Sequence, residues 1–330
     1  MKEAEQEGVD YSIVIPVYNS ARWLPELVSR THDSMEPLGA KWELILVNDK
    51  SPEKGTWETI NSLAKRYTRL RGIDLLYNTG QFRATLCGLE QATGQFIITM
   101  DDDFQNPPEE IPKLISAIQN TPDVDCVIGR YEVKKHSFVR NIGSRLVAEM
   151  HRRLYGKPRN LRTTSFRIMR AEFARTLCMY QIAHPQLGPI MVQLSSNIIN
   201  IPVQHKARTR GQSGYRLKSL VYEVWFSVTN SSIMPLRLMA LIGLFASATG
   251  FVYGLYLIIK RLSGNIKIPG YTSAIVISVF FSGLILMSIG ILGEYVGRII
   301  REITGLPRYS IRKTIGLSDT PTKGNNDFQD

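Results

Sequence analysis

The first 205 residues alternate short apolar runs with segments whose apolar positions recur every three or four residues. Such alternation of strands and helices indicates an α/β fold, with a mostly parallel sheet covered by helices on both faces. The predicted strands are Tyr11–Val17, Trp42–Val47, Ile73–Leu76, Gln95–Met100, Asp125–Gly129, Thr164–Met169 and Asn197–His205. The predicted helices are Ser20–Leu38, Gly55–Tyr67, 80–92, Pro108–Gln119, Phe138–Tyr155 and Ala171–Tyr180.

Two long uncharged stretches, Leu238–Ile259 and Ile268–Gly293, follow. Each is long enough to cross a hydrocarbon core as a helix, so they predict a transmembrane hairpin. Seven Lys and Arg residues flank the pair and three lie in its loop, which predicts cytoplasmic flanks. The alternative is a pair of buried core helices.

The expected organisation has four parts. Residues 1–215 form a cytoplasmic α/β domain, and 216–233 an amphipathic helix at the membrane surface. Two transmembrane helices occupy 234–297, and 298–330 form a cytoplasmic tail. This is a multi-pass protein of the inner (cytoplasmic) membrane.

The net charge restricts the possible binding partners, and the cysteine content restricts the possible compartment. A net charge of +11 favours anionic partners such as lipid headgroups or phosphorylated substrates. Lysines and arginines are not interleaved with aromatics, so we expect no nucleic-acid binding. The three cysteines are far apart and predict neither a disulfide framework nor a zinc site, which favours a reducing compartment.

The most informative motif is Asp101-Asp102-Asp103-Phe104-Gln105, directly after a predicted buried strand. Ligands of parallel sheets bind beyond the carboxyl ends of strands. Side chains alternate along an extended chain, so Asp101, Asp103 and Gln105 are expected to share a face and to bind Mg²⁺ or Mn²⁺. The alternative is a solvated acidic turn before a helix.

Two further motifs follow the first and second strands. Asp49, in Asn48-Asp49-Lys50-Ser51, offers a carboxylate to a nucleobase, and its alternative role is to cap a turn. The segment Pro16-Val17-Tyr18-Asn19 leaves the first strand, where its backbone could line a base.

Taken together, these motifs resemble glycosyltransferase family 2, and within it the polyprenyl-phosphate branch. That branch includes dolichyl-phosphate mannose synthase, bactoprenol glucosyltransferases and the undecaprenyl-phosphate aminoarabinose transferase. The similarity covers about residues 11–312. Its motifs are Ile15-Pro16-Val17-Tyr18-Asn19, Val47-Asn48-Asp49-Lys50-Ser51, Asn78-Thr79-Gly80-Gln81, Asp101 to Glu109, Arg208 to Ser213, and Gly293-Glu294-Tyr295-Val296-Gly297-Arg298.

The resemblance implies a GT-A (Rossmann-like) fold and inverting transfer of a sugar from a UDP-, GDP- or dTDP-linked donor to a polyprenyl (undecaprenyl or dolichyl) phosphate. It implies a divalent metal and catalytic roles for Asp101, Asp103 and Arg208. It also implies association into homo-oligomers, with tetramers among relatives. Implied donor contacts are Pro16, Tyr18, Asn19, Asp49, Gln81, Asp101 and Asp102, and implied phosphate contacts are Arg130, Arg140, Ser144, Arg208 and Ser213.

The chain departs from the family pattern at two places. The family often has Asp-Asp-Gly-Ser where this chain has Asn48-Asp49-Lys50-Ser51. It also often has an Asp and then a Gly before Phe-Arg, where this chain has Leu161-Arg162-Thr163-Thr164-Ser165-Phe166-Arg167. The two alternative functions are a processive polysaccharide synthase and a non-catalytic membrane scaffold with the same fold. A processive polysaccharide synthase would carry a Gln-x-x-Arg-Trp motif, which is absent from the sequence, and the intact acidic triplet argues against a non-catalytic scaffold.

Overall fold

The computed structural model describes residues 8–52, 55–131, 158, 161–180, 187–204, 234–263, 271–303 and 307–316. The chain divides into two compact units. The first, the sheet unit, contains Met1–Gln212 and Pro307–Asp330, and the second, the helical unit, contains Ser213–Leu306.

Within the described residues, the sheet unit has one mixed sheet of eight strands in the order β7-β5-β6-β4-β1-β2-β3-β8. The pairs β1–β2, β1–β4, β2–β3 and β5–β7 are parallel, while β6 and β8 pair antiparallel with their neighbours. This confirms the mostly parallel α/β sheet. The strands are β1 (Tyr11–Val17), β2 (Trp42–Asn48), β3 (Leu70–Leu75), β4 (Phe96–Thr99), β5 (Cys126–Tyr131), β6 (Arg167–Arg170), β7 (Ile198–Val203) and β8 (Ile311–Ile315).

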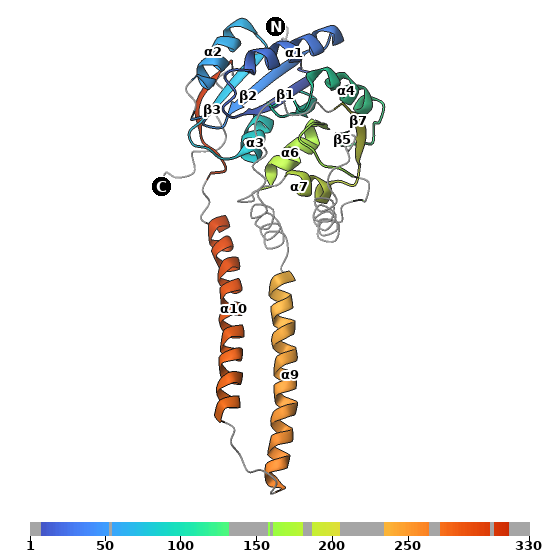
Figure 1. The fold of residues 1–330 in the computed structure, drawn as a ribbon. Helices are drawn as coiled ribbons and strands as arrows, with labels where there is room; N and C mark the ends of the chain where they lie inside the picture. The colour runs from blue at the N-terminus through green and yellow to red at the C-terminus, as the bar shows by residue number, and fades with distance from the viewer. Residues whose placement is uncertain are drawn as a thin grey trace, which may run out of the picture. The chain divides into compact units, whose positions relative to one another are not determined.

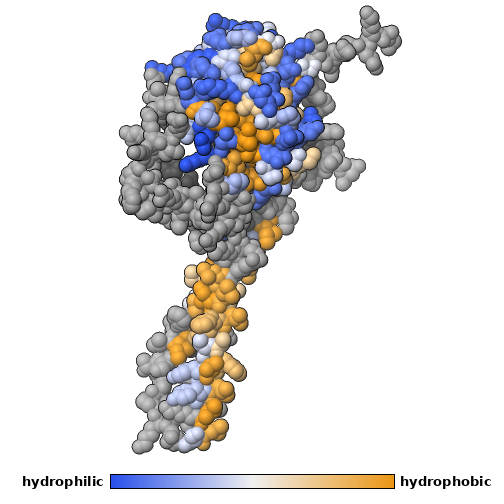
Figure 2. All heavy atoms as spheres, turned by 90° about the vertical axis from the view of Figure 1, so that its right-hand side faces the viewer, coloured by the Kyte–Doolittle hydropathy of each residue, from blue (hydrophilic) through white to orange (hydrophobic). Residues whose placement is uncertain are grey.

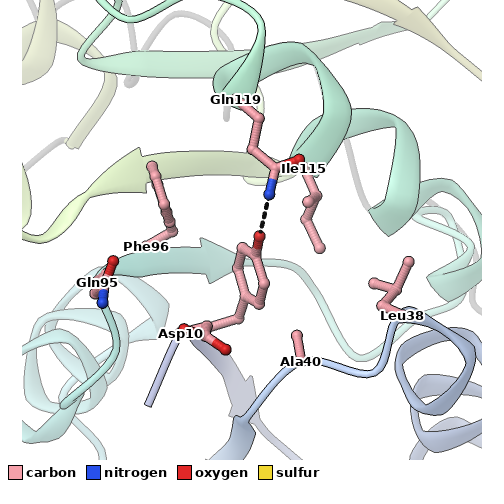
Figure 3. A pocket seen from close by; sticks show the side chains of 8 residues that line it. Asp10, Leu38, Ala40, Gln95, Phe96, Ile115 and Gln119 are labelled. Atoms are coloured by element: carbon pink, nitrogen blue, oxygen red, sulfur yellow. Dashed lines mark hydrogen bonds between the residues drawn. The ribbon is translucent and has the colours of Figure 1, made fainter. Parts of the chain in front are cut away.

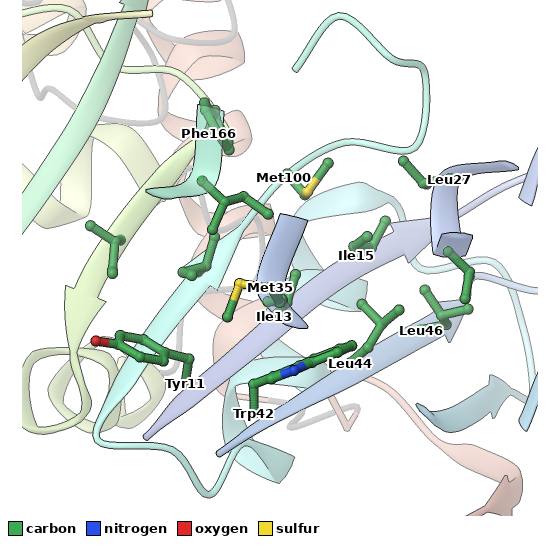
Figure 4. Close-up of a cluster of buried hydrophobic side chains, with 14 of the residues drawn as sticks. Tyr11, Ile13, Ile15, Leu27, Met35, Trp42, Leu44, Leu46, Met100 and Phe166 are labelled. Carbon is green, nitrogen blue, oxygen red and sulfur yellow. The ribbon is translucent and has the colours of Figure 1, made fainter. Parts of the chain in front are cut away.

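Helices cover both faces of this sheet (Figure 1). One hydrophobic cluster packs α1, α2 and α4 against one face, and a second packs α3, α6 and α7 against the other. Figure 4 shows the first cluster around Ile13, Leu44 and Leu46. The helices are α1 (Leu24–Met35), α2 (Thr56–Arg66), α3 (Gln81–Gln91), α4 (Ile111–Gln119), α6 (Ala171–Met179) and α7 (Leu187–Leu194), with 3₁₀ turns at Glu36–Leu38 and Pro108–Glu110.

The position of strand β1 in the sheet explains why its sequence is almost entirely apolar. Ile13 and Ile15 belong to the first cluster and Val14 to the second. Successive side chains of a strand point to opposite faces, and helices cover both faces here. Every residue of β1 is consequently buried, and the carboxyl ends of β1, β2, β3 and β4 meet at one edge of the sheet.

The structure differs from the sequence prediction in several elements. Strand β8 lies in the expected tail 298–330 and pairs with β3, whereas no strand was predicted there. Strand β3 begins at Leu70, before the predicted Ile73, and α7 was not predicted. Three predicted segments lie outside the described residues: the helix Phe138–Tyr155, the motif Arg208 to Ser213 and the amphipathic helix 216–233.

The helical unit contains α9 (Met234–Leu262) and α10 (Tyr271–Ile303), which overlap the two predicted apolar stretches. Many of their apolar side chains face outward: Leu244, Phe245 and Leu286 are 68%, 74% and 69% exposed. Figure 2 shows apolar residues along this unit. Judged on the residues that the structure describes, neither helix is long and apolar enough to cross a membrane.

Candidate functional site

The acidic loop, Asp101 to Asn106, directly follows β4 at the carboxyl edge of the sheet. Asp101 accepts hydrogen bonds from the Gln81 amide at Oδ1 and from the Ser165 hydroxyl at Oδ2. The Asn106 amide lies 3.5 Å from the same Oδ2. Asp101 therefore joins the start of α3 to the segment before β6.

Asp102 points toward the exit of β1. Its Oδ2 accepts a hydrogen bond from the Tyr18 backbone N–H at 3.1 Å and another from the Ser20 hydroxyl. Asp103 instead accepts the Gln105 backbone N–H at 3.1 Å. Strand β4 ends at Thr99, so alternation along an extended chain does not continue through the acidic loop.

Negative charge accumulates in the acidic loop. Burial raises the pKa of Asp101, and the Asp103 carboxylate acts in the same direction. Burial also raises the pKa of Asp102 to about 6, against the hydrogen bonds from Ser20 and Tyr18. Carboxylate oxygens gathered in this way match the hard ligands that Mg²⁺ or Mn²⁺ prefers. Across the described parts of the chain, however, no group of three or more His, Cys, Asp or Glu residues is arranged to hold a metal ion.

The exit of β2 is organised by Asp49, which is only 3% exposed. Its Oδ1 accepts hydrogen bonds from the Thr79 N–H at 2.6 Å and hydroxyl at 2.9 Å, and its Oδ2 accepts the Gly80 N–H at 2.9 Å. Gly80 has φ +85°, a conformation that glycine adopts readily. Asp49 thus fixes the turn that starts α3 and delivers Gln81 to Asp101.

The exit of β1 lies beside this turn. Pro16 is buried in β1, whereas Tyr18 is 48% exposed. The Asn19 N–H donates to the Ser51 hydroxyl at 2.9 Å, and Asn19 has φ +55°. The structure therefore brings Tyr18, Asn19, Asp49, Gln81 and the acidic loop to the same sheet edge.

Sequence reasoning missed two residues next to the acidic loop. Ser165 donates to Asp101, as described above, and its position before Phe166-Arg167 lies in the segment that departs from the family pattern. Arg167 is 4% exposed and donates to the Thr99 hydroxyl at 3.0 Å. Burial lowers the pKa of Arg167, while the Asp101 charge acts against this. The buried guanidinium group of Arg167 therefore lies close to Asp101 of the acidic loop.

The expected phosphate contacts are mostly outside the described residues. Arg130, near the end of β5, is exposed. The other members of the set lie outside the residues that the structure describes: Arg140, Ser144, Arg208 and Ser213.

A separate cavity of 390 Å³ lies at the opposite edge of the sheet (Figure 3). Tyr11 and Phe96, near the amino ends of β1 and β4, line it, and the Tyr11 hydroxyl accepts a hydrogen bond from the Gln119 amide at 2.7 Å. The chemistry-bearing side chains described above are all at the other edge.

A mostly parallel α/β sheet with acidic and amide side chains at its carboxyl edge is typical of proteins that bind nucleotides or other phosphorylated ligands. A profile described as "Glycosyl transferase family 2" matches residues 12–178, and one described as "GtrB C-terminal hairpin" matches residues 234–299. The chain belongs to glycosyltransferase family 2, which confirms the family expected from the motifs.

Two curated relatives extend the similarity over the whole chain. Both are undecaprenyl-phosphate 4-deoxy-4-formamido-L-arabinose transferases. The one from Aeromonas hydrophila is 31% identical over 94% of this chain and 96% of its own length. The one from Shewanella sediminis is 30% identical over 96% of each.

Solved structures are more distant. Glucosyl-3-phosphoglycerate synthase from Mycobacterium tuberculosis, in complex with Mn²⁺, uridine diphosphate and phosphoglyceric acid, has a TM-score of 0.49 and 18% identity, covering 68% of this chain and 77% of that chain. TarS residues 1–349 from S. aureus have a TM-score of 0.44 and 17% identity, covering 67% of this chain and 64% of that chain.

Proposed function

We propose that this chain transfers a sugar from a nucleotide-sugar donor onto the phosphate of a polyprenyl phosphate, and specifically of undecaprenyl phosphate. The observation that carries this proposal is the similarity to two undecaprenyl-phosphate sugar transferases, which extends through the sheet unit and the hairpin alike. The acidic loop supplies a site suited to the donor.

In this proposal the donor diphosphate lies against the acidic loop. Asp101, Asp103 and Gln105 would hold Mg²⁺ or Mn²⁺, supported by the gathered carboxylates of that loop. The metal would neutralise charge on the departing nucleoside diphosphate. Gln81 and Asp102 hold the acidic loop against the start of α3 and the exit of β1.

The nucleoside half of the donor would lie over the exits of β1 and β2. Pro16, Tyr18 and Asn19 border this region, and Tyr18 offers an exposed ring for stacking. A carboxylate has about four acceptor positions, and protein donors already fill three on Asp49. Asp49 would therefore contact the base through its last position while holding the turn that precedes α3.

The acceptor would need little activation. Its phosphate is anionic near neutral pH, because a phosphate monoester has its second pKa near 6, so no catalytic base is assigned. Attack on the anomeric carbon opposite the departing diphosphate would invert that centre. Bringing two anions together requires cations, and arginines offer forked donors that match phosphate oxygens. The proposed set is Arg130, Arg140, Ser144, Arg208 and Ser213.

The connectivity of the sheet supports a membrane hairpin. Strands β1 to β7 precede α9 and β8 follows α10, yet all belong to one sheet. Both ends of the helix pair must then lie on one side of any membrane that the helices cross. Their outward apolar side chains and the uncharged stretches Leu238–Ile259 and Ile268–Gly293 favour such a crossing.

The excess of positive charge in the flanks supports the proposal that the sheet unit faces the cytoplasm at the inner membrane. We also propose that copies of the chain associate into homo-oligomers through their helical units. Crosslinking in native membranes would measure the number of copies in each oligomer.

Purified full-length protein in detergent, incubated with radiolabelled UDP-, GDP- and dTDP-sugars, tests the proposed function. Undecaprenyl phosphate is the acceptor and undecaprenol, which lacks the phosphate, is the matched control. We expect one donor class to give a labelled lipid with the phosphate acceptor only. Label in undecaprenol, or no labelled lipid from any donor, would contradict the proposal.

A further inference from the structure

Among the residues that the structure describes, three other than glycine have a left-handed backbone. They are Asn19, Lys50 and Phe104, with φ of +55°, +51° and +59°. Each follows a strand, β1, β2 or β4, at the edge that carries the candidate site. Asparagine tolerates this conformation, but a lysine there is strained by its Cβ. Strain of this kind persists only where the surrounding structure enforces it, and it concentrates at functional sites.

Hydrogen bonds on both sides of Lys50 enforce its conformation. Asn48 Oδ1 accepts from the Ser51 N–H at 3.2 Å and from the Ser51 hydroxyl at 2.6 Å, which closes the turn around Lys50. Asn48 Nδ2 donates to the fully buried Asp74 at 2.7 Å, and Arg312 of β8 pairs with Asp74. The turn is thus anchored to the sheet through Asn48.

The backbone therefore favours glycine at position 50, which is the residue that the family often has there. The lysine side chain must be explained separately. It is half-buried, and among the described residues it makes no hydrogen bond or ion pair. Lysines commonly bury the stem in this way and keep the charged end in water, which leaves the ammonium of Lys50 available to a ligand.

The position of Lys50 in the sheet indicates what this ligand is. Strand β1 separates β2 from β4, and strands lie about 4.8 Å apart, so the exit of β2 is roughly 10 Å from the acidic loop. With the diphosphate at the acidic loop, the ribose spans this gap and the base reaches the exit of β2. Lys50 follows Asp49 there, so a cationic donor and a carboxylate lie next to each other.

We propose that Lys50 determines which nucleobase the enzyme accepts, by donating a hydrogen bond to the carbonyl oxygen at C4 of uracil or thymine or at C6 of guanine. This inference rests on the proposed function. Guanine carries a carbonyl at C6, and thymine and uracil carry one at C4, whereas adenine and cytosine carry amino groups at these positions. An ammonium group has three donors and no acceptor, so it favours the keto bases and opposes the amino bases.

Calorimetric titration of the full-length protein in detergent with Mn²⁺ tests this inference. The ligands are UDP, dTDP, GDP, CDP and ADP, and the variants are Lys50→Asn, Lys50→Gly and Lys50→Arg. Asparagine and glycine fit the left-handed backbone without the charge. Lys65→Asn on α2, an exposed position, is the matched control for loss of a charge.

We expect wild-type protein to bind its preferred keto nucleotide at least tenfold more tightly than CDP or ADP. Lys50→Asn and Lys50→Gly should lose about tenfold for that nucleotide and leave CDP and ADP unchanged. Lys50→Arg and Lys65→Asn should keep the preference. The melting temperature of Lys50→Gly should equal or exceed that of wild type, because glycine relieves the strain. A purely structural role for Lys50 would lower it.

Two results would overturn the inference while leaving the proposed function intact. In one, the Lys50 variants bind all five nucleotides as wild type does. In the other, they lose affinity equally for all five, which would place Lys50 on the shared diphosphate. Wild-type protein that binds none of the five would instead refute the proposed function, and the inference with it.

Discussion

The two units of this chain place similar apolar side chains in opposite ways. In the sheet unit, Ile13 and Leu46 are fully buried between strands and helices, whereas Phe245 and Leu286 in the helical unit are 74% and 69% exposed. Burying apolar surface gains about 25 cal/mol per Å² in water, so the sheet unit obtains that gain from its own fold. The helical unit does not obtain that gain from the contacts of its own described residues, because these side chains stay exposed.

The largest change in unfolding free energy is expected at β8, the edge strand that follows the helical unit in the chain and pairs with β3. Arg312 donates from Nε at 2.7 Å to Asp74, which is 0% exposed. In Arg312→Met the buried carboxylate loses its cation, which costs about 3–5 kcal/mol of unfolding free energy. Urea denaturation followed by tryptophan fluorescence measures it. Arg69→Met, which breaks an exposed pair with Glu36, should cost less than about 1 kcal/mol, and equal costs would contradict this account.

A matched pair of leucines tests the comparison directly. Leu46→Ala should lower the unfolding free energy of the sheet unit by about 3 kcal/mol, because it leaves a cavity in the core. Leu244→Ala removes the same atoms from an exposed helical position, and should change that free energy by less than about 0.5 kcal/mol. The same urea titration measures both variants. A destabilising Leu244→Ala would show that α9 packs into a protein core.

A charged substitution in α9 tests whether the helical unit is surrounded by hydrocarbon. Phe245→Arg should cost about 2.5 kcal/mol or more on insertion, if the helix lies in hydrocarbon. We expect the variant to be lost from membranes washed with alkaline carbonate, while Phe245→Leu stays with them. Retention of both would show that this position meets water or protein.

The smallest effect concerns acid stability within the sheet unit. Burial raises the pKa of Glu43, but hydrogen bonds from Ser12, Thr93 and Arg71 lower it more, so the pKa lies below its ordinary value. Stability from this carboxylate is present above its unfolded pKa of about 4.3 and is lost as the pH falls through the folded value.

Between about pH 5 and pH 3, the unfolding free energy of Glu43→Gln should therefore fall by about 1 kcal/mol less than that of wild type. Urea midpoints at the two pH values measure the difference, and the exposed Glu36→Gln is the control. An unchanged pH dependence in Glu43→Gln would refute the role of these hydrogen bonds.

The parts of the fold that sequence predicted best are those whose pattern is local. Tyr11–Val17 is apolar throughout because both faces of β1 are covered, and its bounds were predicted in full. Strand β8 contains the adjacent charged residues Arg312 and Lys313 and is fixed by pairing with β3 and by the contact of Arg312 with Asp74. Such long-range pairing leaves no local signal, as does the antiparallel direction of β6.

The position of the candidate site could be predicted from the sequence, but the hydrogen bonds within it could not. The parallel-sheet rule located the strand exits at Asp49 and Asp101. It could not show that Asp49 holds the turn at Gly80, or that Ser165 donates to Asp101, because these bonds join residues 31 and 64 positions apart.

The most direct test of the central claim is sugar transfer to undecaprenyl phosphate by Asp103→Ala, compared with Asp123→Ala at an exposed position outside the site. Loss of one group that stabilises the departing diphosphate should lower the rate by a factor of about 100 or more, whereas Asp123→Ala should match wild type. Transfer by Asp103→Ala at the wild-type rate would contradict a catalytic site built on the acidic loop.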